Sequence, residues 1–200
     1  MDFDLTSEQQ QFRDNVRRFA QDKLAPGALA RAHSPHFPFD ASKLAAQAGL
    51  LGITISEEDG GQGGTLMDAI IAIEEVALID PRGADAIQQG NFGAIRTLAE
   101  YANPAQRERY LPGMLRGEVA IGLGMTESGA GSAVTELTTR VEPDGDGYRL
   151  NGGKVFTSHS AEADIFLIYC RFGPGTGGIG SVIVERGQEG FSFGKPSNYM

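Results

Sequence analysis

The stretch Met125-Thr126-Glu127-Ser128-Gly129-Ala130-Gly131-Ser132 places hydroxyls, a carboxylate and two glycines in one unbroken run. It follows an apolar run, residues 119–123, which predicts a buried strand. Glycines at the end of a strand let backbone N–H groups approach a polar or anionic ligand that a Cβ would keep away. Hydroxyls add side-chain donors that can rotate toward such a ligand. The stretch therefore predicts either a ligand-binding loop or a tight turn between strands.

Composition excludes several classes of protein. The 200 residues carry 40% hydrophobic side chains, which is enough for a core, and a net charge of -9, which disfavours nucleic-acid binding because a phosphate-binding surface needs clustered Lys and Arg. No apolar run approaches the roughly 20 residues of a membrane span. The acidic start of the chain is unlike a signal or transit peptide. We expect a cytoplasmic protein with no nucleic-acid partner and no membrane span.

The cysteine and histidine content argues against a metal site. The one cysteine, Cys170, lies in an apolar run, which indicates a buried thiol in a reducing compartment. The three histidines are scattered along the chain, whereas a metal site needs ligands at suitable spacing. The sequence predicts no bound metal.

The first half of the chain has the pattern of a helical domain. Thr6 or Ser7, with a glutamine three residues later, forms a capping box for a first helix that ends at Pro26. A later helix, residues 66–79, is apolar on most sides, which is typical of a helix that is buried all round. The second expected helix is capped by Asp40 and runs through Ala48, and the fourth spans roughly residues 84–101. A fifth, capped by Asn103, runs to Arg116.

The second half has the pattern of a β-domain. A turn signal at residues 144–147 predicts a hairpin. The glycine-rich residues 173–178 lack a following lysine and helix, so they predict a loop between strands and not a phosphate loop. The expected strands cover residues 119–125, 138–142, 148–151, 154–158, 164–171 and 181–185.

A helical block followed by a block of strands predicts the α+β class. We expect an all-helical domain over residues 1–117 and an antiparallel, barrel-like β-domain over residues 118–200. The change of pattern at Gly117 sets this boundary.

Four segments resemble motifs of the acyl-CoA dehydrogenase family. Residues 126–132, TESGAGS, are similar to the family signature, and residues 148–158, YRLNGGKVFTS, are similar to its second flavin-contacting segment. Residues 50–61 resemble a motif of its helical domain, and residues 182–191 resemble the end of its middle domain. The segments occur in the family order over essentially the whole chain.

The resemblance implies an FAD site beside the middle β-domain. The hydroxyl of Thr126 would meet the pyrimidine edge of the flavin, and Ser158 would lie near its N5–O4 side. Ser132 would approach both a cofactor phosphate and the CoA part of the substrate. The cofactor-binding residues implied in this way are Leu123, Met125, Thr126, Gly131, Ser132, Phe156, Thr157 and Ser158.

Three positions depart from the family pattern. Ala133 stands where Asp is usual, which removes a carboxylate from the local turn. Phe156 replaces the usual Trp and keeps an aromatic face. Ser158 replaces the usual Thr and keeps a hydroxyl.

The resemblance also implies a reaction, the oxidation of a CoA-linked or carrier-protein-bound acyl thioester to the α,β-enoyl thioester. It places the proton-abstracting glutamate in a C-terminal helical domain that is absent from these 200 residues, so no catalytic residue is assigned here and Glu127 is expected to be structural. The chain is expected to be a fragment whose β-domain is incomplete at its C-terminal end, and to bind flavin weakly and be inactive alone.

The resemblance further implies partners for the whole protein. It is expected to be a dimer or tetramer that passes electrons to an electron-transfer flavoprotein. Two alternatives stay open from the sequence: a flavin-dependent oxidase or monooxygenase on the same scaffold, and a catalytically silent subunit.

Overall fold

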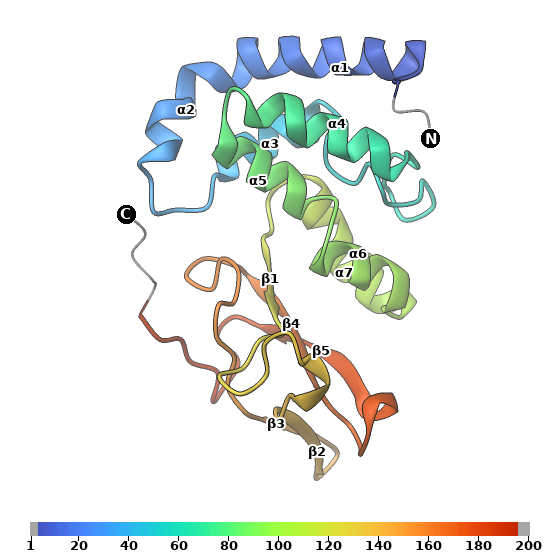
Figure 1. Ribbon diagram of the computed structural model, residues 1–200. Helices are drawn as coiled ribbons and strands as arrows, with labels where there is room; N and C mark the ends of the chain where they lie inside the picture. The colour runs from blue at the N-terminus through green and yellow to red at the C-terminus, as the bar shows by residue number, and fades with distance from the viewer. Residues whose placement is uncertain (1–3, 196–200) are drawn as a thin grey trace. The chain divides into compact units, whose positions relative to one another are not determined.

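A computed structural model describes residues 4–195 of the chain (Figure 1). The chain divides into two units, one ending at Val119 and one beginning at Ala120. The first unit is helical and the second is built on a β-sheet. The α+β class predicted from the sequence is therefore confirmed. Within the described part, no helix is both long and apolar enough to cross a bilayer.

The helical unit begins as the capping signals predict. Thr6 and Gln9 form a capping box for the first helix, and Asn103 and Gln106 form another for the last. The helices are α1 (Ser7–Phe19), α2 (Ala25–Ala32), α3 (Phe39–Gln47), α4 (Leu66–Ala77), α5 (Pro81–Gln89), α6 (Ala94–Tyr101) and α7 (Pro104–Leu115).

Two predicted helix boundaries are wrong. Pro26 does not end the first helix, because a π-helical turn, Ala20–Leu24, leads from α1 into α2. Pro26 lies in the first turn of α2, a position at which proline is tolerated. The second predicted helix, α3, begins after Pro38, so Asp40 lies in its first turn and is not its cap.

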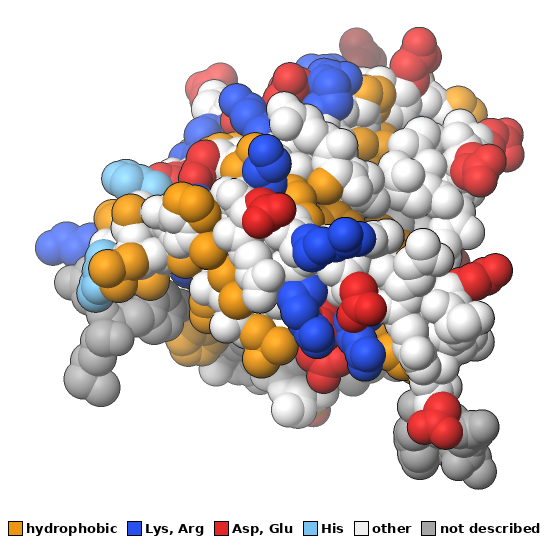
Figure 2. Space-filling view, turned by 90° about the horizontal axis from the view of Figure 1, so that it is seen from above, with side chains coloured by type: hydrophobic (Ala, Val, Ile, Leu, Met, Phe, Trp, Pro, Cys, Tyr) orange, Lys and Arg blue, Asp and Glu red, His pale blue; other side chains and the backbone are white. Residues whose placement is uncertain are grey.

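The core of the helical unit forms where α1, α3, α4 and α5 meet. Leu24, Val76 and Ile87 are completely buried in it. The prediction that α4 is buried all round is wrong, because Leu66 and Met67 are about half exposed. One side of α4 packs against α1 and α5, and its other side is left open. Figure 2 shows apolar side chains interspersed with charged ones on one face of the molecule.

The fourth predicted helix is two helices, α5 and α6, with a break at residues 90–93. Asn91 in this break is completely buried. Its side chain accepts a hydrogen bond from the N–H of Ile53 at 2.6 Å and donates to the carbonyls of Leu50 and Ile87, each at 2.8 Å. The bonds to Leu50 and Ile53 tie Asn91 to the loop before α4, and the bond to Ile87 ties it to α5. They hold the chain in a break at the point where a single helix was expected to continue.

The second unit is a mixed sheet centred on β4. This strand pairs antiparallel with β5 over its whole length and parallel with β1. The start of β2 pairs with the same edge of β4 as β1 does, beyond the end of β1, where Arg140 lies opposite Arg171. The strands are β1 (Ile121–Gly124), β2 (Arg140–Asp144), β3 (Gly147–Asn151), β4 (Ile165–Arg171) and β5 (Ile179–Glu185).

The sequence predicted the β2–β3 hairpin correctly but not the parallel pairing. β2 and β3 are antiparallel and joined through the predicted turn. β1 and β4 are parallel because residues 125–164 connect them, which is long enough to bring the chain back to the same end of the sheet. A wholly antiparallel domain is thus wrong, and the described sheet is open, so it is barrel-like only in a loose sense.

The strand predicted at residues 154–158 is also absent. This segment is irregular, and Phe156 in it has a φ of 55°. His159 follows with a φ of 49°. Positive φ values take the backbone out of the β region, so the chain cannot continue as a strand there.

Candidate functional site

The glycine-rich stretch lies in residues 125–139, a long loop that leaves the sheet beside the edge of β4 and returns to it (the excursion). β5 occupies one edge of β4, so β1 and the start of β2 lie in line along the other edge. Residues 125–139 leave the sheet where β1 ends and return where β2 begins. The N–H of Arg171 donates to the carbonyl of Thr139 at 2.8 Å and fixes the point of return.

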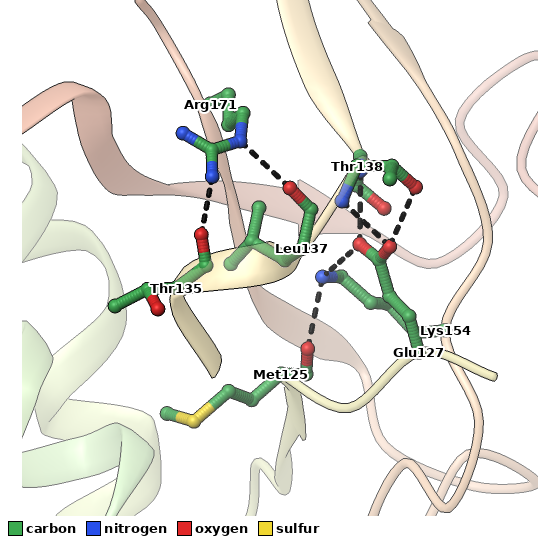
Figure 3. Close-up of polar contacts among 8 residues, drawn as sticks. Met125, Glu127, Thr135, Leu137, Thr138, Lys154 and Arg171 are labelled. Carbon is green, nitrogen blue, oxygen red and sulfur yellow. Dashed lines mark hydrogen bonds and ion pairs between the residues drawn. The ribbon is translucent and has the colours of Figure 1, made fainter. Parts of the chain in front are cut away.

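The carboxylate of Glu127 closes the base of this excursion (Figure 3). Glu127 and Ala130 exchange two backbone hydrogen bonds of 3.1 Å, which form a tight turn. The Glu127 carboxylate accepts bonds from the N–H and hydroxyl of Thr138, both at 2.7 Å, and from the N–H of Thr139 at 2.9 Å. One side chain therefore links the start of the excursion to its end.

Glu127 is held in its ionised form. Burial opposes ionisation, but hydrogen bonds from Lys154, Thr139 and Thr138 outweigh it and hold the pKa of Glu127 far below its usual range. A carboxylate held by several donors is a weak base, and this is consistent with a structural role for Glu127.

Lys154 fastens a second segment to the first (Figure 3). Its ammonium donates to Glu127 Oε1 at 2.7 Å and to the carbonyl of Met125 at 2.9 Å. The side chains of the Lys154–Glu127 pair are each 6% exposed. The next residue, Val155, donates its N–H to the carbonyl of Thr126 at 2.9 Å. Residues 154–155 are thus bonded directly to residues 125–127.

Two glycines of β1 let the second segment pass close to the strand. Gly122 and Gly124 point to the same face, because side chains alternate along a strand. A Cβ on Gly122 would lie 2.9 Å from the carbonyl oxygen of Ser158, and one on Gly124 would lie 3.3 Å from Lys154 Cγ. The small size of these residues therefore determines how closely residues 154–158 approach β1.

Gly122→Ala is expected to destabilise the β-unit by about 1–3 kcal/mol, because overpacking forces neighbours to shift. The added Cβ would also lie 2.6 Å from the ring of Phe166, which is completely buried and cannot move aside freely. Urea unfolding measures the change. Gly153→Ala is the matched control, because nothing lies within 4 Å of the place that its added methyl group would take. Equal unfolding midpoints for the two variants would contradict this account.

The structure brings together only some of the predicted cofactor-binding residues. Met125 and Thr126 are bonded to the second segment, and Thr157 Oγ1 would lie 3.6 Å from a Cβ on Gly124. Leu123 is on β1 beside them. Ser158 has its carbonyl beside Gly122 of β1 and is otherwise exposed, and the remaining ones, Gly131, Ser132 and Phe156, are exposed at the surface.

Two features of these exposed residues suit a ligand. Phe156 is 87% exposed and has a positive φ, and strained backbone at an exposed aromatic residue is typical of functional sites. The N–H groups of Gly131 and Ser132 donate to no acceptor among residues 4–195. The surface thus offers an aromatic face, hydroxyls and backbone donors, which suit a ligand with an aromatic ring and phosphates. No metal-binding group of His, Cys, Asp or Glu side chains occurs in the described part of the chain.

Sequence reasoning missed Lys154 and Arg171. The Arg171 guanidinium donates to the carbonyl of Leu137 at 2.7 Å, to that of Gly175 at 2.9 Å and to that of Thr135, so it fixes the outer part of the excursion. Arg171 directly follows the apolar run of residues 165–170, and a cation in that position is a signal that it has partners.

Comparisons with known proteins agree with the resemblance seen in the sequence. The chain matches the models for the acyl-CoA dehydrogenase N-terminal domain over residues 6–118 and middle domain over residues 122–200. It is 34% identical over 197 residues to a short-chain-specific acyl-CoA dehydrogenase of Clostridium acetobutylicum, with 98% of this chain and 52% of the relative covered.

Two solved structures share the fold. Butyryl-CoA dehydrogenase from Megasphaera elsdenii matches with a TM-score of 0.84 at 30% identity, over 99% of this chain and 53% of that one. PigA, solved as an FAD complex, matches with a TM-score of 0.85 at 26% identity, over 95% of this chain and 51% of that one. The chain spans about half the length of these relatives. It belongs to the acyl-CoA dehydrogenase family, of which it carries the N-terminal and middle domains.

Proposed function

We propose that this chain binds FAD for the oxidation of an acyl thioester to its α,β-enoyl form, through a surface formed by two segments, residues 123–132 and 154–158, the second of which contributes residues 156–158. The observation that carries the proposal is the direct bonding of the two segments through Lys154 and Val155. The names of the Clostridium and Megasphaera relatives support an acyl-thioester substrate. The FAD complex of PigA supports the cofactor.

Each part of the surface has a proposed role toward FAD. Phe156 offers its ring to the flavin, and the hydroxyls of Thr126 and Ser158 donate to the flavin edge. The N–H groups of Gly131 and Ser132 hold phosphate oxygens, and Ser132 also contacts the CoA part of the substrate. Donors fixed in place before binding stabilise charge on the flavin edge without further rearrangement. When bound, FAD supplies the acceptor for the hydride that leaves the substrate β-carbon.

The proposal extends to the whole protein. We place the base that removes the α-proton outside these 200 residues, since Glu127 is fully engaged by Lys154 and two threonines. The whole protein forms a cytoplasmic dimer or tetramer and passes electrons to an electron-transfer flavoprotein. Turnover of an acyl-CoA panel with an artificial electron acceptor, compared with oxygen consumption, separates a dehydrogenase from an oxidase.

Thr126→Ala combined with Ser158→Ala is expected to weaken FAD binding by about 5–150-fold, because each of the two lost hydrogen bonds contributes about 0.5–1.5 kcal/mol. FAD is titrated into the purified protein and followed by flavin fluorescence and absorbance. Thr176→Ala combined with Ser192→Ala is the control, since both hydroxyl residues are exposed and lie outside the two segments. Unchanged affinity, spectrum and reduction potential in the first double variant would count against the placement of the flavin.

A further inference from the structure

The Glu127–Lys154 ion pair joins the two segments that form the proposed flavin site. We infer that Glu127 and Lys154 are positioning residues that set the separation of these two segments and so the affinity for FAD, an inference that rests on the proposed function. Glu127 lies within the first segment, but neither its side chain nor that of Lys154 is given a contact with the cofactor. Their effect would be exerted through Thr126 and Phe156.

The burial of the pair argues for a role in geometry. Each side chain is 6% exposed, and removal of two charges from water is costly even when they meet. An apolar pair of similar volume commonly gives equal or greater stability. An ion pair differs from an apolar pair in that its hydrogen bonds fix particular atoms at particular distances. Here these atoms belong to both segments of the site.

The contacts show which segment each residue controls. Lys154 lies in the second segment, and its ammonium donates to atoms of the first, the carbonyl of Met125 and Glu127 Oε1. Among residues 4–195, these bonds and the bond from Val155 to Thr126 are the hydrogen bonds that hold the two segments together. The bond from Val155 holds Thr126 itself and the residue next to Phe156. These three hydrogen bonds form the joint between the segments, and a shift of this joint would move both proposed flavin contacts.

Glu127 also closes the excursion, and this second role distinguishes the variant Lys154→Met from the variant Glu127→Gln. Without Lys154, its carboxylate keeps three donors from Thr138 and Thr139, so the excursion stays closed. Lys154→Met therefore breaks the joint to the second segment and keeps these three bonds, while it leaves the Glu127 carboxylate without its counter-charge. Glu127→Gln disturbs both the joint and the closure, because an amide offers one acceptor oxygen in place of two and leaves the Lys154 ammonium without its counter-charge.

Hydrogen exchange of the FAD-free protein tests the joint directly. In Lys154→Met we expect the Val155 amide to exchange about tenfold faster or more, because its bond to Thr126 opens more often. The Ala130 amide, held in the Glu127 turn, should keep its wild-type rate. In Glu127→Gln both amides should exchange faster. Unchanged exchange of Val155 in Lys154→Met would overturn the inference.

FAD titration tests the consequence of the joint for binding. At a temperature where every variant is folded, Lys154→Met should raise the FAD dissociation constant about tenfold or more. Lys154→Arg keeps the charge and the donors, so it should retain part of the wild-type affinity that Lys154→Met loses. Arg149→Met removes an exposed ion pair to Asp144 in the same unit and should leave the constant unchanged. If Lys154→Met does not fold, Lys154→Gln takes its place, since it removes the charge and keeps a donor.

The outcomes separate this inference from the proposed function. FAD binding by Lys154→Met at wild-type affinity, with faster exchange of Val155, would mean that the pair is only structural and would overturn the inference alone. Absence of FAD binding by the wild-type protein would overturn the proposed function, and the inference with it. Weaker binding that follows the exchange of Val155 across the variants supports the inference.

Discussion

Replacement of Arg31 by methionine is expected to lower the free energy of unfolding of the helical unit by about 3–5 kcal/mol, because it leaves the carboxylate of Asp80 buried without its counter-charge. Asp80 is completely buried, and its Oδ2 lies 2.7 Å from Arg31 Nε. The same guanidinium bonds to Asp40 at 2.6 Å and to the carbonyl of Leu24. One arginine thus joins α2 to the starts of α3 and α5.

Urea unfolding followed by the far-ultraviolet helix signal measures this loss. The double variant with Asp80→Leu should recover part of the stability, since an apolar pair no longer leaves a charge buried. Arg149→Met is the control, because the Arg149–Asp144 pair is half exposed and such pairs contribute about 0–1 kcal/mol. Similar losses in Arg31→Met and Arg149→Met would show that burial does not determine the contribution of the Arg31 pair.

Local features of the fold could be predicted from the sequence. The capping box at Thr6 and the cap at Asn103 involve residues only three positions apart, so the sequence predicts them directly. The β2–β3 hairpin likewise depends on its own turn residues. The parallel pairing of β1 with β4 could not be predicted in this way, because it depends on how the chain between them returns to the sheet.

The site was predicted from the sequence in a similar, partial way. Resemblance to the family identifies the two segments, but the sequence predicts a strand over residues 154–158, where the structure has none. The contact that shapes this segment is made between Lys154 and Glu127, which are 27 positions apart. Spacing within a segment carries no information about such a partner. The assignment of individual residues to FAD stays a prediction that the variants above can test.

Asn91 shows how a single polar side chain can override a helical pattern. The apolar spacing after Ala84 favours one long helix, yet the chain breaks after Gln89. The buried side chain of Asn91 bonds to the backbone of Leu50, Ile53 and Ile87 and takes the place of backbone partners that the loop lacks. This loop belongs to residues 50–61, the segment that resembles the helical-domain motif of the family. The motif is therefore a loop whose conformation depends on Asn91.

Asn91→Ala is accordingly expected to destabilise the helical unit by about 3 kcal/mol or more, because each buried backbone group left without a partner costs about 1–3 kcal/mol. Urea unfolding measures the change. Asn103→Ala, which removes the exposed cap of α7, is the matched control and should cost about 1 kcal/mol. A loss in Asn91→Ala no larger than that in Asn103→Ala would mean that water or a shifted backbone satisfies the loop. In that case the break between α5 and α6 would need another cause, and the positive φ of 66° at Gly93 would be the first to examine.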